Sequence, residues 1–225
     1  MSALMDLLKV LWEPGPVFAR VREKPSFWWP FLGLCIVQMV IAGLQLPFTK
    51  AMMQARMASA PAGSPDPSKF AAIGIIFVPI GIGIALLIGG VILWVLTSIY
   101  AGEAKFGTIM SVTAYSSVPS IVLLGLASMG VLMMKGVGAI SSPMDMQPSV
   151  GSLIMLFPDA HGFAGGILRG LNIFAVWGCF LTATGISTTH NTSKGTGWAV
   201  ALTALAIGLI VGGALAAVFA GRMAG

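Results

Sequence analysis

Five long apolar runs constrain this chain more than any other feature of its sequence. They lie at residues 27–48, 71–100, 109–134, 167–188 and 198–220. An α-helix needs about 20 apolar residues to cross the hydrocarbon core of a bilayer, and each run is long enough. An open sheet in lipid would leave backbone groups without hydrogen-bond partners, and the repeated alternating strands of a barrel are missing from the sequence. We therefore predict an all-α polytopic membrane protein with five transmembrane helices.

The composition agrees with this class. Of the 225 residues, 57% are hydrophobic and only 8% are charged, whereas soluble domains are about 25% charged. The first apolar run follows a charged segment and is long, so we interpret it as an uncleaved anchor and not as a signal peptide. Cys35 and Cys179 both fall within predicted spans, where we expect free thiols. The net charge of +5 comes without a basic stripe interleaved with aromatics, so we expect membrane-surface attraction and no nucleic-acid binding.

The distribution of basic residues predicts the orientation of the chain in the membrane. Lys9, Arg20, Arg22 and Lys24 form the densest cluster and precede the first span. Cytoplasmic segments carry the excess of Lys and Arg, so we expect a cytoplasmic N-terminus. Five spans then place the C-terminus outside.

Residues 1–26 form a separate N-terminal segment with amphipathic character. Ser2, Asp6, Lys9 and Glu13 recur at helical spacing and give a narrow polar stripe on an otherwise apolar helix. This pattern predicts a helix lying in the headgroup plane, which the sequence Pro14-Gly15-Pro16 must end. The segment serves either as an interfacial anchor or as a docking platform for a cytosolic partner. The expected anchor residues are Trp12, Phe18, Arg20, Arg22, Trp28 and Trp29.

Small residues repeat every four positions in two of the predicted spans. One strip consists of Gly81, Ala85 and Gly89, and the other of Ala204, Gly208, Gly212 and Ala216. Such strips form a smooth groove in which another helix backbone approaches closely. They predict either packing within the bundle or homo-oligomerisation.

Catalytic chemistry finds little support in the sequence. All seven carboxylates fall in termini or loops, and His161 and His190 are expected in loops on opposite sides of the membrane. Arg169 is the only charged residue inside a predicted span, one turn from its end, where it can reach the interface. We expect no enzyme activity, no cofactor and no metal site.

Polar residues nevertheless gather inside the spans, most densely in the stretch AYSSVP at residues 114–119. Pro119 deprives the carbonyl of Tyr115 of its helical donor, so we predict a kink with hydroxyl groups supplying hydrogen bonds. We call the predicted set the polar seam. It consists of Tyr100, Thr113, Tyr115, Ser116, Ser117, Pro119, Asn172, Trp177 and Thr182.

Four motifs in a fixed order resemble a known family. They are WEPGPVFARVREKPSFWWP, YAGEAKFGTIMSVTAYSSVP, LNIFAVWGCFLTATGIS and TTHNTSKGTGWAV. Together they resemble the Yip (Ypt-interacting protein) family of five-span membrane proteins, in a compact bacterial form. The resemblance implies a membrane domain over 27–220 with a short tail at 221–225, a cytosolic N-terminus and, for a bacterial member, the inner membrane.

Eukaryotic members of that family are associated with Rab GTPases and carry an acidic-Leu-Tyr-Gly-Pro motif in a longer N-terminal region. This chain lacks the motif, so Rab GTPase binding is not carried over.

Two functional hypotheses follow from the sequence. The first is a non-enzymatic membrane protein that organises membranes, trafficking or partners through helix–helix association, as a homo-oligomer or with other membrane proteins. The second is a transporter or channel for a small solute or lipid along the polar seam. The long connection from Lys135 to Gly166 contains the apolar patch SLIMLF, which lies at the interface or dips into the membrane.

Overall fold

The computed structural model describes residues 2–57, 67–140 and 149–223, and within these ranges it is helical without named strands. The α-helices are α1 (Ser2–Lys9), α2 (Pro14–Glu23), α3 (Trp28–Met57), α4 (Ile73–Ile76), α5 (Val78–Ala101), α6 (Phe106–Ser116), α7 (Leu124–Lys135), α8 (Gly162–Gly170), α9 (Ile173–Thr189) and α10 (Lys194–Met223). Short 3₁₀ turns lie at Pro67–Phe70, Val137–Ala139 and Leu153–Leu156, and a π-helical turn lies at Pro119–Leu123.

Among the described residues, four helical segments are long and apolar enough to cross a membrane. They are Trp28–Ala55, Val78–Ala101, Phe106–Lys135 and Lys194–Val218. They correspond to four of the five predicted runs. The first run was drawn too short, because α3 continues through Pro47 and ends only at Met57.

The remaining predicted span, 167–188, is not one continuous helix. The chain leaves helical geometry at Leu171 and Asn172, both of which are extended, and this break separates α8 from α9. Asn172 caps α9, because its side-chain oxygen accepts a hydrogen bond from the Ala175 amide at 2.9 Å. An asparagine favours such a cap over a helix interior, which explains the break.

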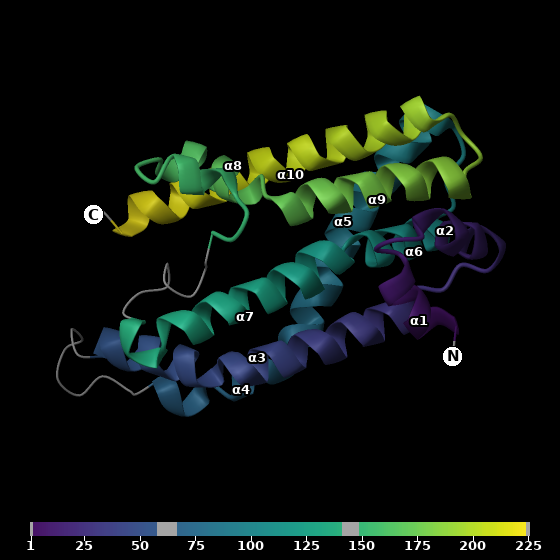
Figure 1. Ribbon diagram of the computed structural model, residues 1–225. Helices are drawn as coiled ribbons and strands as arrows, with labels where there is room; N and C mark the ends of the chain where they lie inside the picture. The colour runs from purple at the N-terminus through teal and green to yellow at the C-terminus, as the bar shows by residue number, and fades with distance from the viewer. Residues whose placement is uncertain (1, 58–66, 141–148, 224–225) are drawn as a thin grey trace.

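The helices form two groups that are joined by α5 and α6 (Figure 1). On one side α3 and α7 lie together, and on the other α8 and α9 pack along successive parts of α10. The N- and C-termini lie at opposite ends of the molecule (Figure 1). Together, α8 and α9 cover one side of the long helix α10 over most of its length.

The stretch AYSSVP marks the joint between α6 and α7. Helix α6 ends at Ser116, and a π-helical turn begins at Pro119. The Ser117 hydroxyl donates to the Ala114 carbonyl at 2.8 Å, so a serine side chain supplies one of the local hydrogen bonds. The predicted interruption at Pro119 is confirmed.

Residues 14–23 pack into the body of the protein, which the sequence did not reveal. Helix α2 contacts both α9 and α6. The Phe18 side chain is completely buried, and a Cβ placed on Gly185 of α9 would lie 3.1 Å from its ring and 2.7 Å from Val112. Phe18 was expected at the membrane interface; the structure corrects this, since it belongs to the core.

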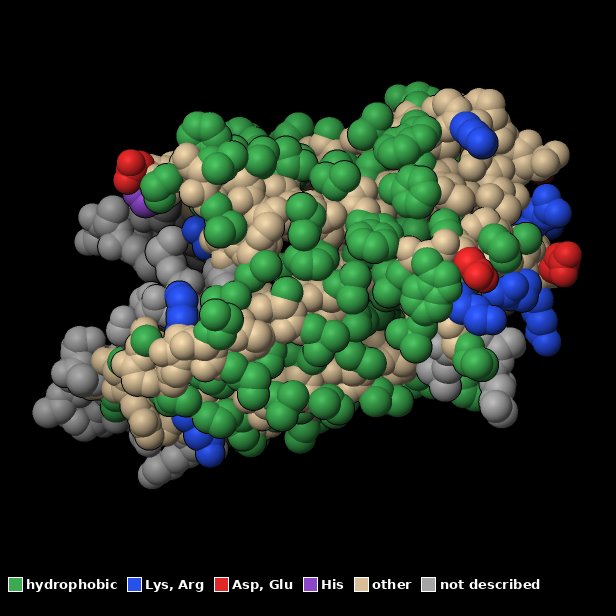
Figure 2. Space-filling model, viewed as in Figure 1, with side chains coloured by type: hydrophobic (Ala, Val, Ile, Leu, Met, Phe, Trp, Pro, Cys, Tyr) green, Lys and Arg blue, Asp and Glu red, His purple; other side chains and the backbone are tan. Residues whose placement is uncertain are grey.

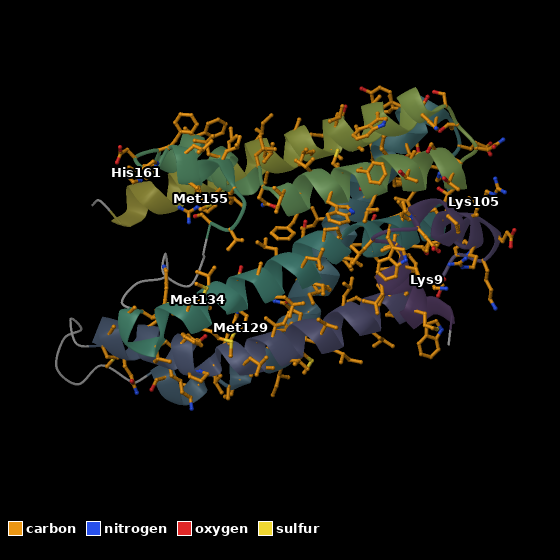
Figure 3. The ribbon with its side chains drawn as sticks, in the orientation of Figure 1. Lys9, Lys105, Met129, Met134, Met155 and His161 are labelled. Atoms are coloured by element: carbon orange, nitrogen blue, oxygen red, sulfur yellow. The ribbon has the colours of Figure 1, made fainter. Side chains whose placement is uncertain are left out.

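The surface separates apolar and charged side chains along the length of the molecule. In the space-filling view, hydrophobic side chains cover the middle of the visible face, and most charged side chains lie toward the two ends (Figure 2). Lys9 and Lys105 lie at the end that holds the N-terminus, and His161 lies at the opposite end (Figure 3). This distribution suits helices that cross a bilayer along their long axis.

Candidate functional site: two cavities beside an interrupted helix

The structure divides the polar seam into separate environments. Tyr100 and Trp177 are 48% and 41% exposed, whereas Tyr115 lies in the core and is only 2% exposed. Pro119 opens the π-helical turn and Asn172 caps α9. These five residues therefore do not share one surface.

The other four seam residues lie on one groove, which we call the Ser116 groove. Its volume is about 460 Å³, and Thr113, Ser116, Ser117 and Thr182 line it together with residues of α5, α9 and α10. Most of its wall is apolar, including Ile88 and Val211. The seam thus supplies a few hydroxyl groups to a groove that is otherwise suited to hydrocarbon.

Most of these hydroxyl groups are already used within their own helices. Thr113 donates to the Ile109 carbonyl at 2.8 Å, and Thr182 donates to the Gly178 carbonyl at 2.9 Å. The Ser116 hydroxyl differs, because it is buried and no described residue lies within hydrogen-bonding distance. Among the described hydroxyl groups that line the groove, it is the only buried one without a hydrogen-bond partner.

Both predicted strips of small residues face the Ser116 groove. Ala85 and Gly89 of α5 and Ala204 and Gly208 of α10 line it. A Cβ on Gly208 would meet no other atom within 4 Å, whereas one on Gly89 would lie 3.7 Å from Thr113. The strip therefore remains open at Gly208.

Two further strip glycines, Gly81 and Gly212, also have open space where a Cβ would stand. Ala216 is different, because a Cβ on Gly166 of α8 would approach its Cβ to 2.7 Å. The C-terminal part of the α10 strip is thus used for packing within the chain.

A second cavity of about 490 Å³ lies between the two helix groups, and we call it the Arg169 cavity. Its described lining is rich in polar side chains from both groups: Gln38, Gln45, Ser120, Ser128, Ser149, Ser152, Arg169 and Asn172. The apolar part of its wall includes Ile82, Ile121 and Leu124. Ala85 and Ser120 line both this cavity and the Ser116 groove, so the two are neighbours across the π-helical turn.

The break between α8 and α9 forms one end of the Arg169 cavity. Residues 151–153 pair with it in an antiparallel bridge between Ser152 and Asn172. The Leu153 amide donates to the Leu171 carbonyl, and the Ile173 amide donates to the Gly151 carbonyl, both at 3.1 Å. The connection therefore returns to the break and supplies its backbone with hydrogen-bond partners.

The position of Arg169 differs from the expectation. It was predicted at the end of a span from which its side chain reaches the interface, but it lies in the last turn of α8, directly before the break. Its side chain lines the cavity, and no ion pair to it is formed within the described ranges. This position is hard to predict from the sequence, because the connection that returns to the break has no periodic pattern.

Of the residues that line this cavity, Gln38 and Gln45 are the easiest to identify from the sequence. They are seven residues apart, which places them on one face of a helix, and the structure places both in the cavity wall. The Gln38 side-chain oxygen is buried with no hydrogen-bond partner in the described part of the chain.

The predicted anchor residues other than Phe18 lie at the surface of the N-terminal region. Trp12, Trp28 and Trp29 are exposed. Arg20 forms a bidentate ion pair with Asp6, with distances of 2.5 Å from Nη2 to Oδ1 and 3.1 Å from Nε to Oδ2. The hydrogen bond to Asp6 raises the pKa of Arg20, and the pair ties α1 to α2.

The chain is similar to a known protein family and to a bacterial membrane protein. The Yip1 domain family matches residues 8–215. The membrane protein YknW of Bacillus subtilis (strain 168) is 26% identical over 204 residues, which cover 88% of this chain and 84% of YknW. No solved structure is significantly similar to this chain. Neither match points to a catalytic family.

Proposed function

Since the chain belongs to the Yip1 domain family of membrane proteins, we propose that it is a non-enzymatic integral membrane protein that acts through helix–helix association. In this proposal it organises the membrane by forming homo-oligomers. The observation that carries the proposal is the Ser116 groove, which is lined by small residues of α5 and α10 and where Gly208 of α10 faces open space. Close backbone approach between membrane helices depends on such residues.

The occupant that we propose for the groove is a helix of a second copy of the chain. Homo-oligomers are the commonest assemblies. The outer faces of the helices offer large apolar side chains that suit a groove of this kind, such as Ile84 of α5 and Leu215 of α10, each more than half exposed.

In the membrane, we propose that α8 and α9 together act as a broken fifth span. Helix α9 has 17 residues, which is at the lower limit for a crossing helix. Five crossings put the termini on opposite sides, in agreement with their places in Figure 1. The basic residues of α2 favour a cytoplasmic N-terminus in a bacterial inner membrane, with the C-terminus outside.

The contact with cytosolic partners would come from α1 and the turn after it. Leu8 and Trp12 are 58% and 62% exposed there. Because α2 packs into the bundle, partner capture is tested with substitutions of these two residues and not with a deletion of the segment.

Homo-oligomerisation is tested by counting subunits in membranes, for example by photobleaching of labelled protein at controlled density. Gly208→Ile fills the groove, and Gly43→Ile is the matched control, because Gly43 in α3 also has open space around its Cβ position but lies outside the groove lining. We expect oligomers for the wild type and the control and monomers for Gly208→Ile. A monomeric wild type, or an oligomer that is insensitive to Gly208→Ile, refutes the proposal.

The two adjoining cavities favour a second candidate function, the transport of a small solute or lipid. In that case the route passes Ser120, which lines both. Replacing Ser116 and Ser117 by Ala would abolish flux into proteoliposomes without changing the oligomer, whereas the association proposal expects no flux in any variant.

A further inference from the structure

We propose that the Arg169 cavity binds a phosphate group, supplied by the headgroup of a membrane phospholipid. The proposal goes beyond helix–helix association and concerns a separate site. It combines a cationic side chain without a described ion-pair partner, a buried side-chain amide oxygen without a described hydrogen-bond donor, and a break in a membrane-embedded helix.

Arg169 and the break lie next to α10. Gly170 packs against α10, because a Cβ on it would lie 2.9 Å from the Leu209 side chain. Leu209 lies within Lys194–Val218, the part of α10 that is long and apolar enough to cross a membrane. The break and the neighbouring Arg169 thus lie beside the apolar part of α10, where a cation without a partner is costly.

The cavity contains the positive charge of Arg169. No aspartate or glutamate of the described ranges lines the cavity, and no ion pair involves Arg169 there. A guanidinium group matches the planar, bidentate geometry of phosphate oxygens. Ser120 and Ser128 add hydroxyl groups to the wall, and hydroxyl groups donate hydrogen bonds to the same kind of ligand. The Ser152 hydroxyl already donates to the Ser149 carbonyl at 3.1 Å.

The cavity wall also holds a hydrogen-bond acceptor without a described donor. The side-chain oxygen of Gln38 is buried and has no donor among the described atoms, although its residue lines the cavity. A buried acceptor in this state costs free energy until a donor arrives. A headgroup that carries a hydroxyl or ammonium group beside its phosphate supplies that donor.

The size and the apolar wall of the cavity indicate what the ligand carries besides its phosphate. The cavity measures about 490 Å³ and has an apolar side formed by Ile82, Ile121 and Leu124. Small-ligand sites commonly have volumes of about 300 to 1,000 Å³. The apolar side accommodates the start of an acyl chain while the polar side holds the headgroup, so the lining suits an amphiphile better than a free ion.

The test is native mass spectrometry of the full chain released from nanodiscs of equal parts phosphatidylglycerol and phosphatidylcholine. We compare the wild type with Arg169→Gln and with Arg22→Gln, which removes an exposed arginine from α2. A charged hydrogen bond contributes enough that its loss weakens binding roughly tenfold or more. We expect retention of phosphatidylglycerol by the wild type and Arg22→Gln, and at least a tenfold loss with Arg169→Gln.

Two further measurements complete the test. Arg169→Lys keeps the charge, so retained lipid with Lys and lost lipid with Gln separate binding from a folding defect, which thermal unfolding also checks. Inorganic phosphate, added to lipid-free protein in detergent, asks whether a free ion suffices: stabilisation by phosphate equal to that by lipid would reject the lipid as the source while supporting the phosphate site. Equal lipid retention by the wild type and Arg169→Gln, or stabilisation by neither probe, overturns the proposal.

Discussion

The contact between α8 and α10 depends on glycine, and an added methyl group measures how tightly the two helices pack. A Cβ on Gly166 would lie 2.7 Å from the Ala216 Cβ, 2.8 Å from the Gly213 Cα and 3.0 Å from the Gly212 carbonyl oxygen. All three contacts are shorter than ordinary van der Waals separations, and two of them involve backbone atoms that cannot turn away. We therefore predict that Gly166→Ala pushes α8 off α10.

The magnitude follows from a matched comparison. Overpacking of a well-packed contact costs about 1 to 3 kcal/mol. Alanine also has a higher helix propensity than glycine by roughly 1 kcal/mol, and a control removes this term. The control is Gly43→Ala in α3, because a Cβ there would meet no other atom within 4 Å. We expect Gly166→Ala to be less stable than Gly43→Ala by about 1 to 3 kcal/mol, or roughly 5- to 150-fold in the unfolding equilibrium.

The assay is the loss of helical circular dichroism as sodium dodecyl sulfate is titrated into mixed micelles. Hydrogen exchange of the α8 amides serves as a local readout, and it should speed up in Gly166→Ala alone. Equal unfolding curves for the two variants, with unchanged exchange in α8, would refute the packing of α8 on α10.

Three further predictions concern the N-terminal region and the α9 terminus. Gly185→Ala should displace α2, because the new Cβ would stand 3.1 Å from the Phe18 ring of α2, besides 2.7 Å from Val112 of α6; limited proteolysis at the N-terminal segment should accelerate, and unchanged cleavage would contradict this contact. Arg20→Met should destabilise the chain by about 1 to 2 kcal/mol, since it leaves the carboxylate of Asp6, whose side chain is only 10% exposed, without its partner; the double variant with Asp6→Asn should recover part of the loss. Burial lowers the pKa of His190, so the unfolded chain binds its proton first, and stability should fall as the pH drops below about 6.5 and level off below the folded pKa; His190→Gln should flatten this dependence in thermal unfolding, and an unchanged slope would show that another group is responsible.

The membrane class and most of the helices could be predicted from the sequence because lipid imposes one simple rule. A run of about 20 apolar residues has few alternatives to a helix, since its backbone must satisfy its own hydrogen bonds. The interruption at Pro119 was predictable because proline removes a backbone donor, although this signal does not suffice alone, since α3 continues through Pro47.

The break at Leu171 and Asn172 was not predictable from hydropathy. Arg169, Gly170 and Asn172 interrupt the apolar run at this point, but the mean hydropathy of the run stays high, and only the capping preference of Asn172 specifically favours a helix end. The burial of Phe18 was missed for a related reason, because an amphipathic helix looks the same in sequence whether its apolar face meets lipid or protein. The pairing of Ser152 with Asn172 depends on a contact across the chain that no local pattern encodes.

The structural role of residues 151–153 connects the break to the proposed phosphate site. A helix break at membrane depth leaves amide and carbonyl groups that lipid cannot satisfy, and each costs several kcal/mol. The bonds from Leu153 to Leu171 and from Ile173 to Gly151 satisfy the Leu171 carbonyl and the Ile173 amide, so this segment stabilises the break. Ser152 lies between these bonds and also lines the Arg169 cavity. A ligand that binds Arg169 and contacts Ser152 would therefore hold the returning segment on the break, and emptying the cavity would loosen the hydrogen bonds between residues 151–153 and the break.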